Sequence, residues 1–404
     1  MPHRFSDIEA VIEAIARGKV VIVVDAEDRE NEGDFVCAAE KASPEIINFM
    51  ITHGRGQVCI PVLPDVCERL KLPLMVETNT APLGTAFTVP IDHRTNKTGI
   101  TAQERAATVL AVIDPDSKPA DFVRPGHMFP LRAREGGVLR RAGHTEAAID
   151  LARLAGLFPA GVLCEILDDE GNRADRDFLF RLAREHDLLV TSIEHLIRYR
   201  RRSEKLVYRL TEALLPTKYG PGQIIAYGVK YEQQEPLAFV LGDLASVEAP
   251  LVRMHSSCFT GDLLGSLRCD CGDQLHLALQ AIQDAGAGVL VYLPQEGRGI
   301  GLVEKIRAYA LQDQGLDTVE ANLALGYKAD AREYGVGIQI LKDLNLRKVR
   351  LLTNNQKKID AFLAGGFDLH VVDQIPIVPT VHEHNARYLA TKRDKLGHQL
   401  PPEA

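Results

Sequence analysis

The chain has 404 residues, of which 46% are apolar and 25% are charged, and its formal net charge is −8. This length and composition predict two, or at most three, globular domains, each with its own core. Seven cysteines, an odd number, argue against a disulfide framework and leave clustered thiols free to bind metal. The acidic charge argues against general nucleic-acid binding. No apolar run of membrane-spanning length and no signal-peptide core is present, so we expect a cytoplasmic protein without membrane or nucleic-acid partners.

Two mixed regions of strands and helices follow one another along the chain. In the first, residues 20–24 (VVIVV) and 161–167 (GVLCEIL) predict strands, and residues 145–157 (TEAAIDLARLAGL) predict a helix. Residues 198–205 (RYRRRSEK) then lose apolar content and gain charge, which predicts a domain boundary.

The second region repeats this mixture. Its predicted elements are strands at 288–293 (GVLVYL) and 349–352 (VRLL), helices at 302–314 (LVEKIRAYALQDQ) and 331–344 (AREYGVGIQILKDL), and a frayed tail at 391–404. We therefore predict an α/β (α+β) fold with two domains, 1–200 and 201–404. Each domain is expected to have a mixed-sheet or barrel-like core with flanking helices.

An acidic loop directly follows the first predicted strand. Residues 25–34 (DAEDRENEGD) carry six carboxylates and one arginine, Arg29. Like charges this close repel and raise each other's pKa unless a divalent cation or a cationic ligand neutralises them. Hard cations such as Mg²⁺ prefer carboxylate oxygens and keep waters that a substrate can displace. The loop is therefore either a magnesium site or a solvated surface loop.

Two histidines and a glutamate favour a catalytic interpretation of this loop. His127 lies in RPGHMFPL (124–131), His144 lies in RAGHTEA (141–147), and Glu165 lies inside the strand-like LCEIL. Histidine, glutamate and a divalent metal can together remove a proton next to a carbonyl group, because the metal polarises the oxygen while a base takes the proton.

These segments, with HGRGQVCI, TGITAQERAATV and PAGVLCEI, resemble the 3,4-dihydroxy-2-butanone 4-phosphate synthase family over about residues 5–200. The resemblance implies conversion of ribulose 5-phosphate to a four-carbon phosphoketone and formate, with Mg²⁺ or Mn²⁺ as cofactor. It implies that Glu30 and His144 bind the metal and that His127 and Glu165 carry the proton transfers. The residues that it places against the sugar phosphate are Arg29, Glu30, Asp34, Arg141, Thr145 and Glu165, with Glu32, Cys59 and Thr98 lining the site.

Three cysteines lie close together in the second region. Cys269 and Cys271 are one residue apart in SLRCDCGDQ, and ten residues separate them from Cys258. Thiolates at this spacing favour zinc. Three ligands would leave a fourth position for water, as in hydrolytic sites. Alternatively, His255 or His276 closes a structural zinc site.

Two probable strand ends carry groups suited to phosphate. Residues 294–301 (PQEGRGIG) lie between a strand and a helix and offer backbone N–H groups to an anion, while residues 353–358 (TNNQKK) bring lysines. Taken alone, the first is a weak signal and the second reads as a solvated turn. Together with the cysteine segment, KIRAYALQDQGLDTVEANLALG and ADAREYG, they resemble GTP cyclohydrolase II over about residues 206–400. The order of the halves is that of bifunctional riboflavin-biosynthesis enzymes.

This second resemblance implies hydrolysis of GTP to a ribosylaminopyrimidine phosphate, formate and diphosphate, with Zn²⁺ bound by Cys258, Cys269 and Cys271. It implies Asp330 as proton acceptor and Arg332 as nucleophile toward the α-phosphorus. On physical grounds Arg332 is first a phosphate clamp, because a guanidinium stays protonated. The residues placed against GTP are Arg253, Met254, His255, Ser256, Ser257, Gln274, Glu296, Gly297, Arg298, Thr318, Thr353 and Lys358, with Tyr309 near the ring-opening chemistry.

Three positions depart from the cyclohydrolase pattern. Ser257 replaces a longer polar residue, Pro294 a common arginine, and Gln356 a common proline. None is a metal ligand, so the departures bear on GTP affinity. Two other functions stay open: one half is active and the other is a scaffold, or the second half is a zinc-stabilised binding module. Each resemblance implies a dimer, so we expect a homodimer.

Overall fold

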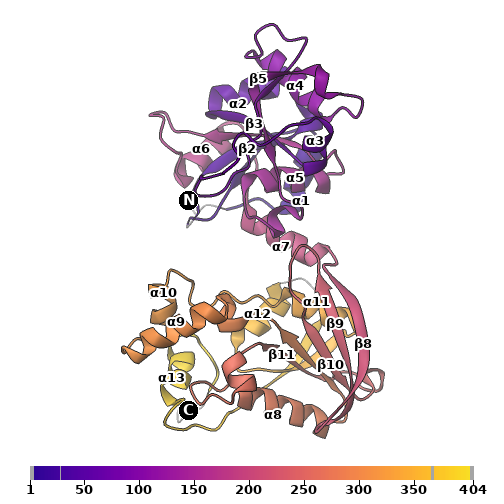
Figure 1. The fold of residues 1–404 in the computed structure, drawn as a ribbon, viewed down its shortest axis with the longest axis vertical. Coiled ribbons are helices and arrows are strands. Elements are labelled where there is room, and N and C mark those ends of the chain that lie inside the picture. Colours follow the sequence, from indigo (N-terminus) through magenta and orange to yellow (C-terminus); the bar gives the residue numbers. More distant parts are fainter. Residues whose placement is uncertain (1–3, 28, 365–367, 401–404) are drawn as a thin grey trace. The chain divides into compact units, whose positions relative to one another are not determined.

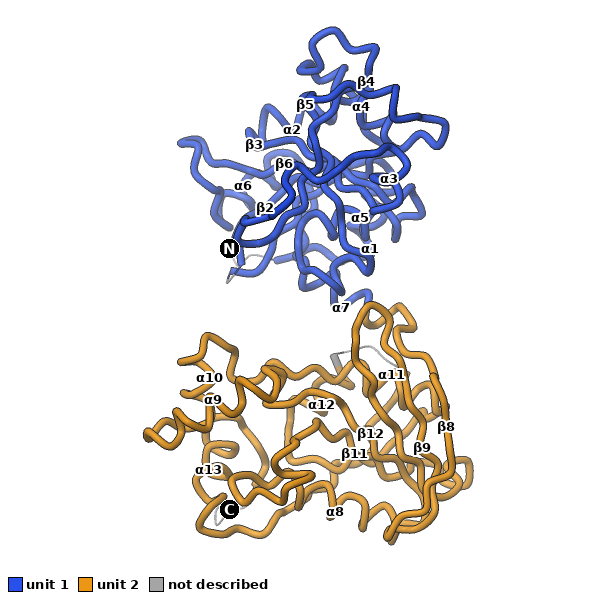
Figure 2. Tube along the Cα trace, viewed as in Figure 1, with its two compact units in different colours: residues 1–200 blue, residues 201–404 orange. Residues whose placement is uncertain are grey.

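The computed structural model describes residues 4–27, 29–364 and 368–400. The chain separates into two compact units, residues 1–200 and 201–404 (Figure 2). None of the helices within the described ranges has both the length and the apolar character needed to cross a bilayer.

Unit 1 is built on a seven-stranded mixed sheet with the strand order β4-β5-β3-β6-β2-β1-β7, flanked by helices (Figure 1). Its strands are β1 (Val21–Val24), β2 (Gly33–Ala38), β3 (Arg55–Val62), β4 (Ile91–His93), β5 (Phe122–Arg132), β6 (Gly161–Ile166) and β7 (Val190–Ser192). Its α-helices are α1 (Ile8–Ala16), α2 (Pro44–His53), α3 (Pro64–Arg69), α4 (Ala102–Ile113), α5 (His144–Leu154) and α6 (Arg176–Glu185), and α7 (Ile193–Ser203) continues across the boundary into unit 2.

Both faces of this sheet are covered, which explains why β1 is apolar without alternation. Ile22 and Val24 belong to one core cluster, whereas Val21 and Val23 belong to another. A strand buried on both faces reads as a continuous apolar run. The acidic loop that follows β1 is therefore held at the end of a fully buried strand.

Unit 2 contains a second seven-stranded mixed sheet, in the order β14-β13-β11-β12-β10-β9-β8. Its strands are β8 (Val207–Thr217), β9 (Gly220–Val229), β10 (Leu237–Leu241), β11 (Leu251–Ser256), β12 (Gly288–Leu293), β13 (Lys348–Leu352) and β14 (His370–Ile375). Its α-helices are α8 (Cys271–Asp284), α9 (Leu302–Asp313), α10 (Thr318–Ala324), α11 (Gly335–Asp343), α12 (Gln356–Ala364) and α13 (Ala386–Asp394).

The parallel half of the second sheet determines where the site can form. β11 pairs in parallel with β12 and with β13, so the carboxyl ends of these three strands meet at one edge. The segments that leave this edge begin at Ser257, Pro294 and Thr353. Crevices outside the carboxyl ends of such strands are the usual ligand sites of open α/β sheets.

The predicted fold class of two mixed sheets with flanking helices is confirmed. Two local predictions differ from the structure. The helix predicted from residue 331 begins at Gly335, because the preceding segment turns Arg332 back onto Asp330. The tail expected to fray contains the end of α13 and a β-bridge between His398 and Asn355, and Lys392 is buried there, while residues 401–404 lie outside the described residues.

Candidate functional site

The acidic loop of unit 1 meets His144 at the start of α5. The Nδ1 atom of the buried His144 lies 3.8 Å from a carboxylate oxygen of Glu30, 4.0 Å from one of Glu32 and 4.0 Å from one of Asp34. Its Nε2 atom lies 3.1 Å from the carbonyl oxygen of Val23 and must donate to it, because a carbonyl oxygen only accepts. A ligating histidine is commonly fixed this way through its other nitrogen. The arrangement leaves Nδ1 directed at the carboxylates.

The pKa values of this cluster indicate an excess of negative charge. Burial and the nearby charge of Glu30 raise the pKa of Glu32 to about 7, and burial raises the pKa of Asp34 well above its usual range. Burial opposes the ionisation of Glu30, but His144 and Arg29 lower its pKa to about 2. Burial disfavours the imidazolium of His144, yet Asp34 and Glu30 raise its pKa to about 9. Protons or cations therefore stabilise the cluster.

Two ligand triads share His144. One triad adds Asp25 and Glu30, the other adds Glu32 and Asp34, and the ligand atoms within each triad lie within 4.8 Å of one another. One imidazole nitrogen with several carboxylates suits Mg²⁺ or Mn²⁺ better than a thiophilic metal. The predicted ligands Glu30 and His144 thus lie together, and Asp25 joins them. Asp28, another member of the acidic loop, lies outside the described residues.

The predicted sugar-phosphate residues surround this cluster unevenly. Glu165 in β6 lies opposite Asp34 in the register with β2, and its carboxylate accepts a 2.8 Å bond from the backbone N–H of Gln57. Arg29 donates to Asp25 at 2.9 Å and to Glu30. Its guanidinium is therefore part of the acidic cluster.

Arg141 and Thr145 lie on either side of His144 in the chain. Arg141 donates to the buried carboxylate of Glu146 at 2.8 Å and to the hydroxyl of Thr85 at 3.0 Å. Thr145 is buried in the first turn of α5. The sequence analysis gave Glu146 no role, although it lies inside the motif that identified His144.

His127 and Thr98 are hydrogen-bonded to carboxylates outside the acidic cluster, whereas Cys59 lies close enough that burial and the charges of Glu165 and Asp34 raise its pKa. His127 Nδ1 lies 2.7 Å from a carboxylate oxygen of Asp92, and a second oxygen of Asp92 accepts from the His127 backbone N–H at 3.0 Å. Thr98 donates to Glu104 at 2.9 Å, and Cys59 is buried in β3. Asp92 is a functional candidate that the sequence analysis missed, because only the pairing of β4 with β5 brings it to His127.

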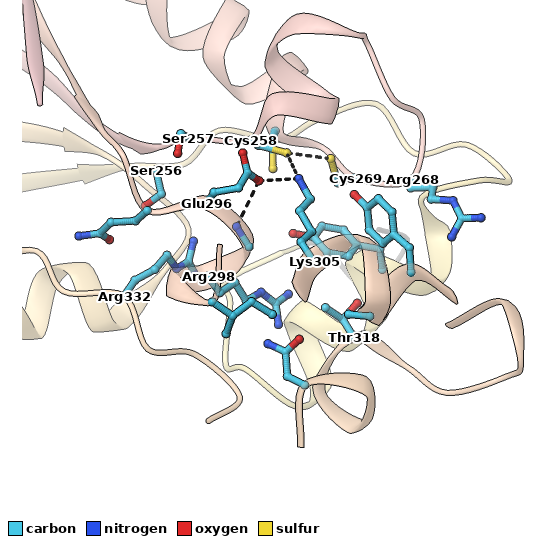
Figure 3. Close-up of a pocket in the computed structure, with 18 of the residues that line it drawn as sticks. Ser256, Ser257, Cys258, Arg268, Cys269, Glu296, Arg298, Lys305, Thr318 and Arg332 are labelled. Carbon is cyan, nitrogen blue, oxygen red and sulfur yellow. Dashed lines mark hydrogen bonds and ion pairs between the residues drawn. The ribbon is translucent and has the colours of Figure 1, made fainter. Parts of the chain in front are cut away.

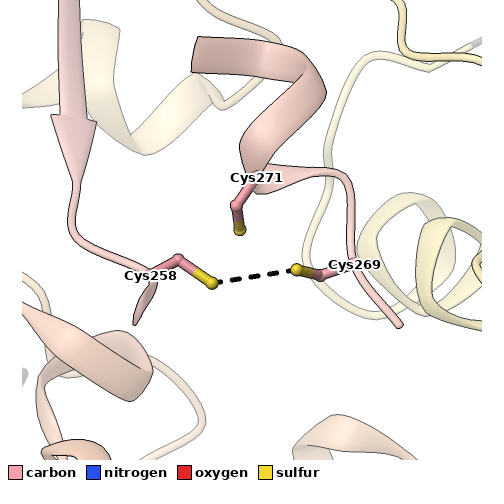
Figure 4. Close-up of side chains that lie close together, drawn as sticks. All are labelled: Cys258, Cys269 and Cys271. Carbon is pink, nitrogen blue, oxygen red and sulfur yellow. Dashed lines mark hydrogen bonds between the residues drawn. The ribbon is translucent and has the colours of Figure 1, made fainter. Parts of the chain in front are cut away.

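The three cysteines of unit 2 converge at the carboxyl end of β11 (Figure 4). The sulfurs of Cys258 and Cys269 are 3.8 Å apart, and all three sulfurs lie within 4.8 Å of one another. Gly261 borders them so closely that a Cβ atom there would lie 3.0 Å from the Cys269 sulfur and 3.1 Å from the Cys258 sulfur. Three thiols converging on one point fit Zn²⁺.

The histidines that could close this site are bonded elsewhere. His255 Nε2 lies 3.0 Å from both carboxylate oxygens of Asp262, and His276 Nδ1 lies 2.7 Å from the hydroxyl of Tyr219. In the part of the chain that the structure describes, no histidine, aspartate or glutamate joins the three cysteines as a further ligand. The arrangement favours the open, hydrolytic interpretation over the structural one.

Lys305 adds a positive charge to the cysteine cluster (Figure 3). Its ammonium group donates to the Cys258 sulfur at 3.1 Å and to Glu296 at 2.7 Å. The neighbouring sulfurs and Lys305 lower the pKa of Cys258. The sulfur of Cys258 in turn helps raise the pKa of Cys269 to about 12. The cluster therefore holds one thiolate readily and needs a cation to hold three. Lys305 lies in the first turn of α9 and is the first residue of the segment KIRAYALQDQGLDTVEANLALG, but the sequence analysis gave it no role.

Asp330 and Arg332 form a bidentate ion pair before α11. Arg332 donates from Nε at 2.8 Å and from Nη2 at 2.6 Å to the two oxygens of Asp330. Burial opposes the ionisation of Asp330, but Arg332 lowers its pKa to about 2. Burial disfavours the charge of Arg332, yet Tyr334 and Asp330 raise its pKa further. Both groups are charged, so Arg332 serves as a cation here.

Two adjoining pockets contain the remaining predicted residues. The pocket at the cysteines is lined by Ser256, Ser257, Glu296, Gly297, Arg298, Thr318, Tyr309 and Arg332 (Figure 3). The second is lined by Arg253, His255, Ser256, Gln274, Arg298, Arg332, Thr353 and Lys358, together with Tyr388, Lys392 and His398. Cys271, Arg298 and Arg332 border both pockets, so a ligand can extend from the sulfurs into the cationic region.

The second pocket has more buried cations than carboxylates. Burial and the charges of Arg253 and Arg332 hold the pKa of Lys358 well below its usual range, and Lys358 donates to the backbone carbonyl of Met254 at 2.6 Å. Buried nitrogens of Arg253 (Nε) and Arg298 (Nη1) have no partner among the described residues. An anion would satisfy these donors. The Met254 side chain lies in the core, so only its backbone faces this chemistry.

The three departures from the cyclohydrolase pattern are placed differently. Ser257 lines the cysteine pocket, whereas Pro294 lines a separate pocket with Arg201 and Glu333. Gln356 starts α12 and donates to Asp360 at 3.1 Å. Only Ser257 borders the sulfurs directly.

Comparisons with known proteins cover both units. A family model described as 3,4-dihydroxy-2-butanone 4-phosphate synthase matches residues 9–199, and one described as GTP cyclohydrolase II matches residues 208–376. The riboflavin biosynthesis protein RibBA of Bacillus mycoides is 54% identical over 396 residues, which cover 98% of this chain and 99% of that protein. The protein of the same name from Bacillus subtilis is 53% identical over 397 residues, with the same coverage.

A solved structure also matches most of the chain. RibBX, described as a two-domain 3,4-dihydroxy-2-butanone 4-phosphate synthase from A. baumannii, has a TM-score of 0.70 and 37% sequence identity. The match covers 92% of this chain and 100% of that one.

Proposed function

The chain belongs to the riboflavin biosynthesis proteins that join a 3,4-dihydroxy-2-butanone 4-phosphate synthase to a GTP cyclohydrolase II, and on that premise we propose how its residues divide the two reactions. It is a bifunctional enzyme. We assign the synthase to residues 1–200 and the cyclohydrolase to residues 201–404. The homodimer expected from the sequence stays a prediction.

In the synthase, Glu30 and His144 hold Mg²⁺ or Mn²⁺, with Asp25, Glu32 or Asp34 as further oxygen donors. The bound cation supplies polarisation of the substrate's carbonyl and hydroxyl oxygens. Glu165, beside Asp34, serves as the base of the proton transfers. The support is the cluster itself, whose buried carboxylates face one histidine nitrogen.

The second acid–base group of the synthase is His127. Its imidazole is about half exposed and is oriented by Asp92. A carboxylate on one imidazole nitrogen fixes the tautomer and leaves the other nitrogen to exchange a proton with substrate. Arg141, held by Glu146, presents a guanidinium suited to the substrate's phosphate.

In the cyclohydrolase, Cys258, Cys269 and Cys271 hold Zn²⁺. When bound there, zinc would supply Lewis acidity for the hydrolysis of the imidazole ring of GTP. Arg253, Arg298, Arg332 and Lys358 bind the triphosphate, and Asp330 accepts a proton. The observation that carries this assignment is that three converging thiols border the same cavity as a group of buried, incompletely bonded cations.

One comparison favours a second candidate, in which only unit 1 is catalytic. The structurally similar RibBX is described as a synthase alone, although it has two domains. In the present chain, the cysteine cluster and the Asp330–Arg332 pair support an active second unit.

Formate release separates these possibilities, since both proposed reactions liberate formate. The purified full chain is incubated with Mg²⁺ and Zn²⁺ and with either GTP or ribulose 5-phosphate as sole substrate. We expect formate from each substrate. Formate release from ribulose 5-phosphate but not from GTP would make unit 2 a scaffold. No formate release from either substrate by folded, metal-loaded protein would refute both assignments.

A further inference from the structure

The C-terminal segment of unit 2 reaches the cationic pocket. The cyclohydrolase family model matches the chain only to residue 376, whereas α13 and the residues after it extend the described structure to Leu400. Three side chains of this segment, Tyr388, Lys392 and His398, line the pocket that contains Arg253 and Lys358. None of them belonged to the motifs that identified the site.

Lys392 makes a buried ion pair with an aspartate that lies between two zinc-ligand candidates. Its ammonium group donates to both carboxylate oxygens of Asp270, at 2.9 Å and 2.7 Å. The two side chains are only 7% and 1% exposed. Asp270 separates Cys269 from Cys271 in the chain. The pair therefore ties α13 to the cysteine turn.

Asp270 also begins a chain of hydrogen bonds that ends at Arg253. Its carboxylate accepts from the Gln274 side chain at 2.6 Å, and the Gln274 side-chain oxygen accepts from Arg253 at 2.5 Å. Arg253 also donates to the backbone carbonyl oxygen of Leu352 at 2.8 Å, while its Nε has no partner among the described residues. The series Lys392, Asp270, Gln274 and Arg253 fixes the guanidinium and leaves one donor available.

Lys392 balances the negative charge of the buried Asp270 carboxylate. A buried carboxylate that loses its partner is strongly disfavoured, and it seeks the nearest cation. Without Lys392, the nearest guanidinium to Asp270 along this chain is Arg253, which would then be drawn from the pocket. With Lys392 present, Asp270 is neutralised and Arg253 stays directed at the anion.

The rest of the segment is anchored to the loop that carries Thr353 and Lys358. The backbone N–H of Gln399 donates to the carbonyl of Asn354 at 2.8 Å, and His398 pairs with Asn355 in an isolated β-bridge. The Tyr388 ring lies 5.7 Å from the guanidinium of Arg298 and 5.4 Å from the ammonium of Lys392. The segment thus contacts three separate parts of the pocket.

We propose that residues 386–399 complete the GTP pocket and that Lys392 is a positioning residue, which holds Arg253 in its phosphate-binding orientation through Asp270 and Gln274. This inference rests on the proposed cyclohydrolase function of unit 2. It names a role for a segment that was expected to fray from residue 391 onward.

The test measures GTP binding by equilibrium dialysis, together with kcat and KM for formate release from GTP, in the full-length holoenzyme. We expect Lys392→Ala to weaken binding and raise KM by about tenfold or more, because it leaves a buried charge unpaired. Lys392→Arg should restore most of the binding. The matched control is Arg393→Ala, which removes the same charge from the next position of α13, where the side chain pairs with Asp394 at the surface. It should behave as wild type.

A double substitution that removes both buried charges tests the mechanism and controls for misfolding. Lys392→Met combined with Asp270→Asn should bind GTP more tightly than Lys392→Met alone, since no buried charge is left unpaired. Formate release from ribulose 5-phosphate and the zinc content of each sample verify that the chain is folded. If Lys392→Ala loses zinc, the role of Lys392 is judged from the comparison of Lys392→Met with the double variant.

Three results would overturn the proposal. They are unchanged binding and KM in Lys392→Ala, a double variant no better than Lys392→Met, and a wild-type chain that does not bind GTP. A wild-type chain that binds GTP but releases no formate from it refutes the cyclohydrolase assignment instead. In that case the binding comparison still judges the role of Lys392.

Discussion

The acidic cluster of unit 1 and the sulfur cluster of unit 2 present opposite electrostatic problems. Around His144, carboxylates outnumber cations, and burial raises the pKa of Asp34 and Glu32. Around Cys258, the thiols adjoin Lys305 and a pocket rich in arginine and lysine. In the proposed function, a hard cation completes the first site, and a thiophilic cation and an anion together complete the second. The comparison teaches that each unit carries the charge that its proposed ligand would neutralise.

The largest expected effect is that of Cys269→Ala. This substitution should lower formate release from GTP by about a thousandfold or more. It should also release the zinc, because two thiolates and water hold zinc weakly. Formate release from ribulose 5-phosphate should be unchanged. Metal analysis and the two formate assays check this outcome. The control is Cys67→Ala, which removes a buried thiol of unit 1 far in sequence from the cluster and should leave zinc bound. Loss of both activities in Cys269→Ala would contradict the independence of the two sites.

Glu30→Ala should show the reverse pattern. Removing this carboxylate takes away a proposed ligand of Mg²⁺ and the partner of Arg29, so we expect the ribulose 5-phosphate reaction to fall by about a hundredfold. The GTP reaction should be unaffected. The matched control is Glu27→Ala, an exposed carboxylate of the same loop. Equal losses in both variants would show that the loop acts through its total charge and not through a defined ligand.

Asp92→Asn sharpens the description of unit 1. If Asp92 orients His127, its loss should lower kcat for the sugar reaction by about 10- to 100-fold, because general acid–base catalysis depends on the orientation and tautomer of the imidazole. Adding Asp92→Asn to His127→Asn should then cost little more. Additive effects of the two substitutions would assign Asp92 a purely structural role.

The smallest effect concerns the Asp330–Arg332 pair. Arg332 holds the folded-state pKa of Asp330 at about 2, below the ordinary 3.8. A depressed carboxyl pKa contributes stability that is fully present above the unfolded-state pKa and is lost as the pH falls through the folded-state pKa. Asp330→Asn should therefore destabilise unit 2 by about 2 kcal/mol at pH 7.

The same difference should stay constant down to about pH 4 and shrink toward pH 2. Urea unfolding followed by circular dichroism and tyrosine fluorescence measures it, since the chain has no tryptophan. Asp284→Asn, at an exposed position of α8, is the control and should show no such pH dependence. A pH-independent difference for Asp330→Asn would mean that the ion pair does not stabilise the fold.

Much of the site was predictable because its chemistry is local in the sequence. The acidic loop follows a buried strand, and the Cys-x-Cys turn brings two thiols together within three residues. Glycine-bordered histidines and the strand ends before residues 294 and 353 marked further parts of each site. These signals depend on residue type and short spacing, which the chain displays without folding.

The residues that were missed depend on distant pairings. Asp92 reaches His127 only through the pairing of β4 with β5, and Lys305 reaches Cys258 across 47 positions of the chain. Lys392 reaches Asp270 across 122 positions. Asp92 and Lys392 stand outside the quoted motifs, and Lys305 begins one of them without a role of its own, so residue type and short spacing did not mark these charges as functional.

The sequence by itself determined the two families, the division of the chain and the types of candidate metal ligand in each unit, because thiols, imidazoles and carboxylates select their partners by type. The tertiary structure decided which of these groups are buried and which charges remain unpaired. It also placed Lys392 and His398, from the tail expected to fray, in the lining of the cationic pocket. The physical reason is that a charge such as Lys392 is buried only where its partner Asp270 is already in place, and only the folded chain provides that partner.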